Sequence, residues 1–278
     1  LSALFLSCVS PALAQQNDVP LNRDIYYDID RNGACRTSTM HTGLRPIIES
    51  RADLDNVMGF RPDSSRHYYY VTAKLFREHL IQVKHEGFKV TIDPVFRFEL
   101  GSDLVETAVA NANRSTNNFN SRGFWVKCDL GKDVSFHTGF YENQAIPPIY
   151  LYQYIQGSGV IPGQGRIKEF LERSFDFSWA HGNVSWSPKR WLNMQFGNGR
   201  HFVGNGYRSV LLSDNTFPYP YLKFSAITNN QRFQYTTINA RFQSVGDPGD
   251  RLPTGESLES LFSWRRASFK HLSVNLGP

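Results

Sequence analysis

The chain has 278 residues, of which 14% are aromatic and 20% charged, and its formal net charge is +5. After the first 14 residues no stretch approaches the ~20 consecutive apolar residues of a transmembrane helix, which excludes a helical membrane protein. The basic residues are dispersed, so nucleic acid is not an expected partner, whereas an anionic surface such as lipopolysaccharide is compatible with this charge. Membrane β-strands stay compatible as well, because alternating lipid-facing and interior residues keep the mean hydropathy low, here −0.41.

The N-terminus is predicted to be part of a secretory signal. Residues 1–14 form a short apolar run that ends in Ala12-Leu13-Ala14, the small-x-small pattern cut by signal peptidases. We assign them to an incomplete signal peptide and expect the mature chain to begin near Gln15, while Cys8 leaves a lipoprotein signal open. Export would place Cys35 and Cys128 in an oxidising compartment, where they could pair, although nothing local brings them together.

Residues 15–87 are predicted to form an N-terminal periplasmic segment that is irregular and partly helical. Apolar residues at helical spacing indicate a short amphipathic helix within Val71–Val83. Asp28–Gly33 matches the opening of a calcium-binding loop, but Thr39 stands where such a loop needs a bidentate Glu. The sequence therefore favours a polar turn at Asp28–Gly33, and no metal site is predicted.

From Phe88 onward apolar residues recur at every second position, which predicts β-strands. The clearest case is Phe88–Leu100, where Phe88, Val90, Ile92, Phe96, Phe98 and Leu100 share one face. Pro94 indicates a bulge or a sheet edge there, because proline cannot donate a ladder hydrogen bond. In all, eight strands are expected, at residues 88–100, 124–130, 134–141, 174–187, 191–197, 221–228, 232–245 and 268–276.

The expected connections fall into two alternating classes. Short turns near residues 131, 189 and 230 alternate with long segments at 101–120, 143–173, 198–220 and 246–267. Outer-membrane barrels combine short periplasmic turns with long extracellular loops. The predicted fold class is therefore all-β, an antiparallel transmembrane outer-membrane β-barrel to which residues 88–278 contribute about eight strands and which is truncated. A soluble β-sandwich is the alternative.

The segment Gly197–Gly206 is rich in glycine and polar residues. A phosphate-binding loop would need a helix directly after such glycines, and none is predicted. We expect the glycines to let a strand end bend and pack closely where it enters a loop at the barrel mouth. The polar residues there are candidates for contact with sugar hydroxyls: Asn198, Arg200, His201, Asn205, Arg208 and Asn215.

No catalytic, cofactor or metal site is predicted. The histidines are dispersed and form no metal-ligand pair at helical spacing, and Gly157-Ser158-Gly159 lacks the frame of a nucleophile elbow. A lipid or glycan hydrolase on the barrel wall is kept as an alternative, to be tested at His137 or His181.

The run Phe196–Asn215 resembles the gliding-motility proteins of the RemB type, which are related to the Wzi-type capsule-assembly barrels. Thr39–Pro46, Phe140–Ala145 and Val160–Arg166 agree with this family in the same order, so the resemblance covers most of the mature chain. It implies an outer-membrane barrel preceded by a small periplasmic segment, without catalytic residues to carry over. The family's barrels are longer, which implies truncation after Pro278.

The sequence thus predicts a non-enzymatic protein of the cell outer membrane that acts in gliding motility or in the assembly and attachment of capsular polysaccharide. Its expected partners are outer-membrane lipid and lipopolysaccharide, together with surface polysaccharide or proteins of the motility machinery. The rival is a porin-like channel, in which charged interior side chains would set selectivity: Arg97, Glu99, Lys127 and Asp129.

Overall fold

The computed structural model describes residues 16–34, 40–52, 69–76, 78–102, 116–170, 173–245 and 262–276. Most of these residues belong to one antiparallel β-sheet. The expected signal peptide, Cys35 and Thr39 lie outside the described residues. Within them Cys128 is a free cysteine.

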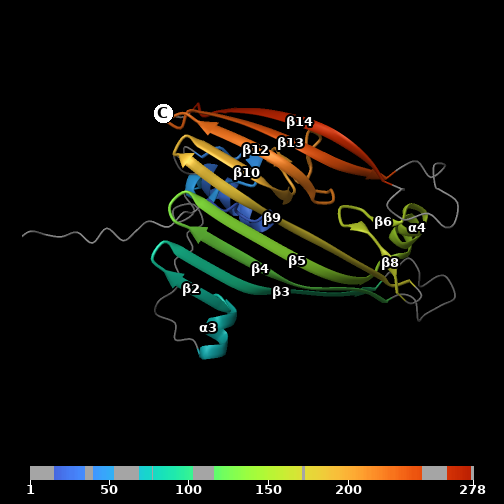
Figure 1. Ribbon diagram of the computed structural model, residues 1–278. Helices are drawn as coiled ribbons and strands as arrows, with labels where there is room; N and C mark the ends of the chain where they lie inside the picture. Colours follow the sequence, from blue (N-terminus) through green and yellow to red (C-terminus); the bar gives the residue numbers. More distant parts are fainter. Residues whose placement is uncertain are drawn as a thin grey trace, which may run out of the picture.

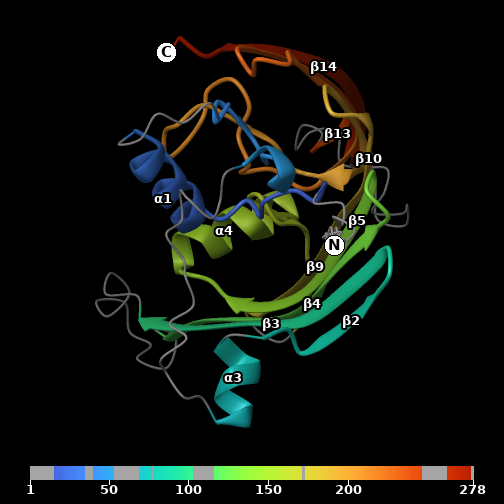
Figure 2. The same ribbon diagram turned by 90° about the vertical axis from the view of Figure 1, so that its left-hand side faces the viewer.

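The sheet contains all eight expected strands, each hydrogen-bonded to its neighbours in the sequence. A ninth strand, β2, precedes them, and the two-residue β8 (Lys168–Glu169) pairs with β9. In spatial order the strands are β2 (Ile81–His85), β3 (Phe88–Ser102), β4 (Thr116–Leu130), β5 (Val134–Ile146), β9 (Phe175–Lys189), β10 (Leu192–Gly199), β12 (Tyr219–Ile227), β13 (Phe233–Val245) and β14 (Phe262–Val274). The sheet is strongly curved but open, and β2 and β14 are its two edges (Figures 1 and 2).

The two ends of the sheet differ as the sequence predicts. Short turns follow β2, β4, β9 and β12 at one end, which we call the short-turn end (Figure 1). Neighbouring turns are bonded together there, since the Gly131 amide donates to the Gly87 carbonyl at 2.6 Å. The predicted turns at 131–133 and 229–231 are confirmed, and the third is shifted from 188–190 to Arg190–Trp191.

Longer connections gather at the other end, the long-connection end (Figure 1). The connection between β5 and β9 contains helix α4 (Ile149–Ser158) and the small β6–β7 hairpin (Val160–Ile161 and Gly165–Arg166). The connection between β10 and β12 contains β11 (Phe202–Val203), which pairs with β1 (Leu44–Arg45) from the N-terminal segment.

The N-terminal segment lies inside the curve of the sheet (Figure 2). It consists of helix α1 (Arg23–Ala34), β1 and a 3₁₀ turn, η1 (Glu49–Arg51). The segment has a small apolar core of its own, made by Val19, Tyr26, Ile29 and Ile47.

Two local expectations for this region are wrong. Asp28–Gly33 lies within α1 and forms neither a calcium loop nor a polar turn. The helix expected over 71–83 is α3 (Tyr70–Phe76), and residues 81–85 instead form β2, because Ile81 and Val83 pair with Ile92 and Val90 of β3. That pairing ends at Ile92, so Pro94 lies where β3 becomes an edge, as its missing amide hydrogen requires.

The convex face of the sheet carries exposed apolar side chains in the half nearer the short turns. Phe196 of β10 is 68% exposed, and Val184 and Trp186 of β9 are 46% and 45% exposed. The strand register places apolar side chains on this same face of every long strand. We call this set the outer apolar band: Val90, Ile92, Val126, Cys128, Phe136, Phe140, Val184, Trp186, Met194, Phe196, Leu222, Phe224, Tyr235 and Leu272.

Nearer the long-connection end the face chemistry is reversed on β4, β5 and β9, whereas on β3 the outward Phe96, Phe98 and Leu100 stay apolar and are 65%, 72% and 88% exposed. The outer face there carries the ion pair of Arg122 and Glu142 at 3.0 Å, whereas Phe175 and Phe177 pack inward beneath α4. The expectation of an apolar exterior is therefore wrong for the later part of β13. Its apolar residues Ile238 and Ala240 are buried on the inner face, where Leu44 and Tyr221 cover them.

None of the described helices is long and apolar enough to cross a membrane.

Candidate functional site: the inner face of the curved sheet

Asp18 connects the N-terminal segment to the middle of the inner face. Its carboxylate is 4% exposed and accepts hydrogen bonds from Asn183 Nδ2 at 2.7 Å and Gln195 Nε2 at 2.9 Å. Asn183 also donates to the Tyr221 hydroxyl at 2.9 Å. Side chains on β9 and β10 thus converge on one buried carboxylate, which is satisfied by amide donors, and Asn183 also connects it to Tyr221 on β12.

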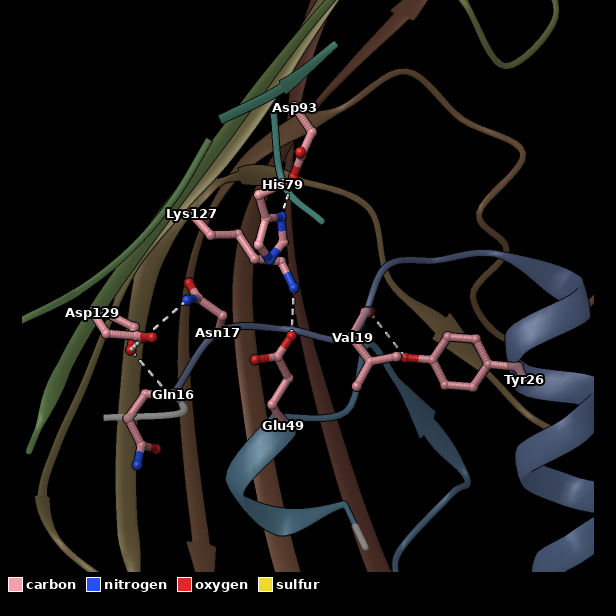
Figure 3. A network of polar contacts seen from close by, with 10 residues as sticks. Gln16, Asn17, Val19, Tyr26, Glu49, His79, Asp93, Lys127 and Asp129 are labelled. Carbon is pink, nitrogen blue, oxygen red and sulfur yellow. Dashed lines mark hydrogen bonds and ion pairs between the residues drawn. The ribbon is translucent and has the colours of Figure 1, made fainter. Parts of the chain in front are cut away.

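Further polar contacts fix the two ends of this segment (Figure 3). Asn17 Nδ2 donates to Asp129 Oδ1 at 3.1 Å, and Lys127 Nζ lies 2.5 Å from Glu49 Oε1. Lys127 and Asp129 both come from β4, so the two side chains that a porin-like channel would place in its lumen instead bind Glu49 and Asn17.

Within the segment, Tyr26 joins α1 to the chain that contacts the sheet. Its hydroxyl donates to the Val19 carbonyl at 3.2 Å (Figure 3) and accepts from the Ile47 amide at 3.0 Å. Burial raises the pKa of Tyr26 far above its ordinary value, so the hydroxyl keeps its proton and both bonds.

Of the six predicted site residues, Arg200 and Asn215 come together. Arg200 Nη2 donates to the Gly163 carbonyl at 2.8 Å. A Cβ built on Gly163, which has φ +73°, would lie 2.5 Å from Asn215 Oδ1. Both predicted residues therefore meet the β6–β7 hairpin, although Phe196–Asn215 and Val160–Arg166 are separate in the sequence. Burial lowers the pKa of Arg200 to about 10, and Asp214 and Tyr141 oppose that shift.

His201 does not lie at a mouth. Its side chain is fully buried, with Nδ1 3.1 Å from the Tyr219 hydroxyl and its ring edge-on to Tyr221 at 4.4 Å. Burial, and then the charge of Lys223, lower the pKa of His201 well below its ordinary value, so the ring is neutral near pH 7. Its role in this arrangement is packing.

The remaining three predicted residues are separated from one another. Asn198 lies on the outer face of β10, beside the apolar band, and donates to the Ala180 carbonyl at 2.9 Å. Asn205 Oδ1 accepts a hydrogen bond from Arg45 at 3.4 Å. Arg208 lies over the Tyr207 ring at 5.9 Å, on a loop that also contacts α1. The six predicted residues therefore do not come together in one place, and contact of any of them with sugar hydroxyls stays a prediction.

The structure reveals a group of rings that the sequence analysis did not assemble. The inner aromatic cluster consists of Trp125, His137, Tyr141, Trp179 and His181, which come from β4, β5 and β9 and face the inside of the sheet. Tyr141 and Trp179 stack with their ring centres 4.1 Å apart and an interplanar angle of 18°. Trp125 lies 4.7 Å from His181.

Arg200 brings the predicted loop to this cluster. Its guanidinium lies 4.6 Å from the centre of the Trp179 ring, a cation–π distance. Several buried polar atoms here lack a hydrogen-bond partner within the part of the chain that the structure describes: Trp125 Nε1, His137 Nδ1, His181 Nδ1 and Arg200 Nε. Such a group combines flat apolar faces with unused hydrogen-bonding atoms, which is the chemistry that binds a polyhydroxylated ring.

His137 and His181, the two residues expected to matter for a hydrolase, both belong to this cluster. Their rings lie 5.6 Å apart, and each contacts Trp125. Among the described residues, no group of three or more His, Cys, Asp and Glu side chains is arranged to hold a metal ion.

Comparison of the chain with protein-family models, with curated protein sequences and with solved structures finds no match.

Proposed function

We propose that this chain forms part of the wall of an outer-membrane β-barrel. The observation that carries the proposal is the reversal of the usual burial pattern near the short turns. Phe196 is 68% exposed on the convex face, while Asn193 and Ser185 are 0% exposed on the concave face. Exposing so many large apolar side chains to water would be unfavourable, whereas lipid would cover them. Further strands that pair with β2 and β14 would close the wall.

We further propose that the interior binds a ligand and does not serve as a wide channel. Residues 16–34 and 40–52 occupy the inside of the curve and are attached through Asp18, Asn17 and Glu49. A porin-like pathway would require this segment to leave. These bonds therefore support recognition, without bond making, over diffusion through a lumen.

The proposed ligand class is surface polysaccharide, bound at the inner aromatic cluster near the long-connection end. Sugar rings pack their C–H groups against aromatic side chains, which the half-buried Tyr141 and Trp179 supply, and Arg200 with the ring nitrogens named above can serve hydroxyls. The resemblance to RemB-type and Wzi-type proteins favours the same role, in gliding motility or in holding capsular polysaccharide, with motility-machinery proteins as further candidate partners.

The lipid-facing surface can be tested at Cys128. This residue belongs to the outer apolar band, where it pairs with Val90 and Phe136. The full chain with Cys8→Ser and Cys35→Ser is labelled with a nitroxide at Cys128 and reconstituted in vesicles. We expect collisions with oxygen to be frequent and collisions with a water-soluble nickel chelate to be rare.

The control label is placed on the same face, outside the band. Ser178 of β9 is exposed and pairs with Glu142, so Ser178→Cys in a cysteine-free background should be open to the nickel chelate. Equal access of the chelate to positions 128 and 178 would refute the lipid-facing assignment.

Glycan binding can be tested at Trp179. We expect Trp179→Ala to weaken binding of surface polysaccharide from the producing cells by about tenfold, because a stacked ring contributes about 1 kcal/mol beyond its buried area. Trp179→Phe should retain most of the affinity. Trp264→Ala removes a tryptophan from the outer face of β14 and should change affinity less than twofold. Equal loss in Trp179→Ala and Trp264→Ala would contradict the proposed site.

A further inference from the structure

A second candidate site lies at the short-turn end, away from the inner aromatic cluster. It is a cavity of about 870 Å³ between the chain at 40–51 and the inner face of β12 and β13. Gln16, the end of β9 and the turns that follow β4, β9 and β12 contribute the rest of its lining. This volume lies within the range of cavities that bind small molecules.

Positive charge dominates the described residues that line this cavity. One carboxylate, that of Asp133, lies among five cationic side chains. Three of the cations lie in or next to the turns: Lys132 and Arg190 in the turns, and Lys189 at the end of β9. The other two, Arg51 and Lys223, lie deeper, on η1 and β12.

The two deeper cations are held in place by neutral groups. Arg51 donates to Ser225 Oγ at 3.0 Å and to the Ser225 carbonyl at 3.4 Å. Lys223 is 3% exposed, and its Nζ lies 3.4 Å from the Pro46 carbonyl. Within the described residues neither cation forms an ion pair with a carboxylate. Burial lowers the pKa of Arg51 to about 10, as expected for a cation withdrawn from water without a countercharge.

The rest of the lining suits a ligand larger than a simple ion. Trp191 and Ile47 provide apolar surface, and Gln16, Asn229 and Gln234 provide amide groups. Guanidinium and ammonium groups bind phosphate and carboxylate through charge-assisted hydrogen bonds. We infer that this cavity binds a sugar-sized ligand that carries a phosphate or carboxylate group.

This inference does not rest on the proposed function. The cavity and the inner aromatic cluster share no residue, and the argument from its charges holds with or without a surrounding bilayer. A saccharide with an acidic group and one with a phosphate group share the chemistry that the cations recognise, so both are used as probes.

The test compares three probes by calorimetry on the full chain in detergent: glucose 1-phosphate, glucuronic acid and glucose. We expect at least one of the two anions to bind, more weakly as salt is raised, and glucose to give no measurable heat. The anion that binds shows whether the cavity recognises a phosphate group or a carboxylate group on the sugar. Absence of binding by both anions, or binding of glucose as tight as theirs, would overturn the inference.

The variants localise the binding. Lys189 and Arg190 are exposed, so Lys189→Gln with Arg190→Gln should leave the fold intact and weaken anion binding by about tenfold or more. The matched control, Lys84→Gln with Lys168→Gln, removes two exposed charges elsewhere and should have less than a twofold effect. Arg51→Gln tests the deeper position. Equal affinity of the Lys189–Arg190 variant and its control would show that anions bind elsewhere, which refutes the assignment.

Discussion

Replacing Asp18 with alanine should release the N-terminal segment from the sheet while the strands stay paired. The carboxylate is the common acceptor for Asn183 and Gln195, and both donors lie on the inner face. Asp18→Ala leaves these amides without their charged partner in a buried place. Asp28→Ala, on the exposed side of α1, removes the same charge without such bonds and is the control.

The expected loss follows from the two hydrogen bonds. A hydrogen bond to a charged group contributes about 1.5–3 kcal/mol, and both donors have a second acceptor, Tyr221 for Asn183 and Ser185 for Gln195. Partial compensation lowers the sum, so we expect the local free energy of opening to fall by about 2–4 kcal/mol. This corresponds to a reduction of amide protection by roughly 30-fold to 900-fold.

Hydrogen exchange measures this directly, because two amide hydrogen bonds join the segment to the rest of the molecule. The Gln16 amide donates to Ser135 Oγ at 3.1 Å, and the Gly204 amide donates to the Gly43 carbonyl at 2.8 Å. Exchange of these two amides should accelerate in Asp18→Ala, whereas amides in the β4–β5 hairpin should keep their protection. Unchanged exchange at Gln16 and Gly204, or equal acceleration in Asp28→Ala, would refute the view that Asp18 anchors the segment.

Two further predictions concern buried polar groups. Because the folded pKa of His201 is lowered by burial, the unfolded chain takes up the proton first, so stability falls as pH drops below about 6.5, by up to about 1.4 kcal/mol per pH unit. His201→Gln should remove this contribution of His201 to the pH dependence of the urea midpoint. An unchanged pH dependence would contradict the view that His201 is buried in its neutral form. Tyr26→Phe should cost about 1–3 kcal/mol in thermal unfolding, since the Val19 carbonyl and Ile47 amide lose their partner. Tyr27→Phe, 65% exposed, should cost less than about 0.5 kcal/mol.

The strands were predictable because their signal is local. Alternation at every second residue and the turn at 131–133 depend only on neighbouring residues, and all eight expected strands pair in sequence order. The position of the N-terminal segment was not predictable in this way. Its anchor, Asp18, bonds to Asn183 and Gln195, which are 165 and 177 residues away. No sequence pattern signals contacts at that separation.

The candidate site was predicted less well, because its residues were chosen by residue type without regard to which face of the strand each position occupies. Phe196 and Asn198 lie two positions apart on β10, so an outward Phe196 requires an outward Asn198. The same alternation would have placed Trp125 on the same face of β4 as Lys127, a residue that was expected to face the interior of the barrel. Assembling the inner aromatic cluster then needs the register of β4, β5 and β9, which a single sequence does not specify.

The Arg122–Glu142 pair has a consequence for the height of the molecule above a lipid surface. On β4 and β5 it marks the level of the convex face at which charge replaces the apolar band. On β9 the residue at that level is Ser178, and three residues separate it from Phe175 at the far end, or roughly 10 Å of strand. In the proposed orientation this collar would hold α4 and the connections clear of the lipid headgroups, where a long polymer can reach them without first entering the bilayer.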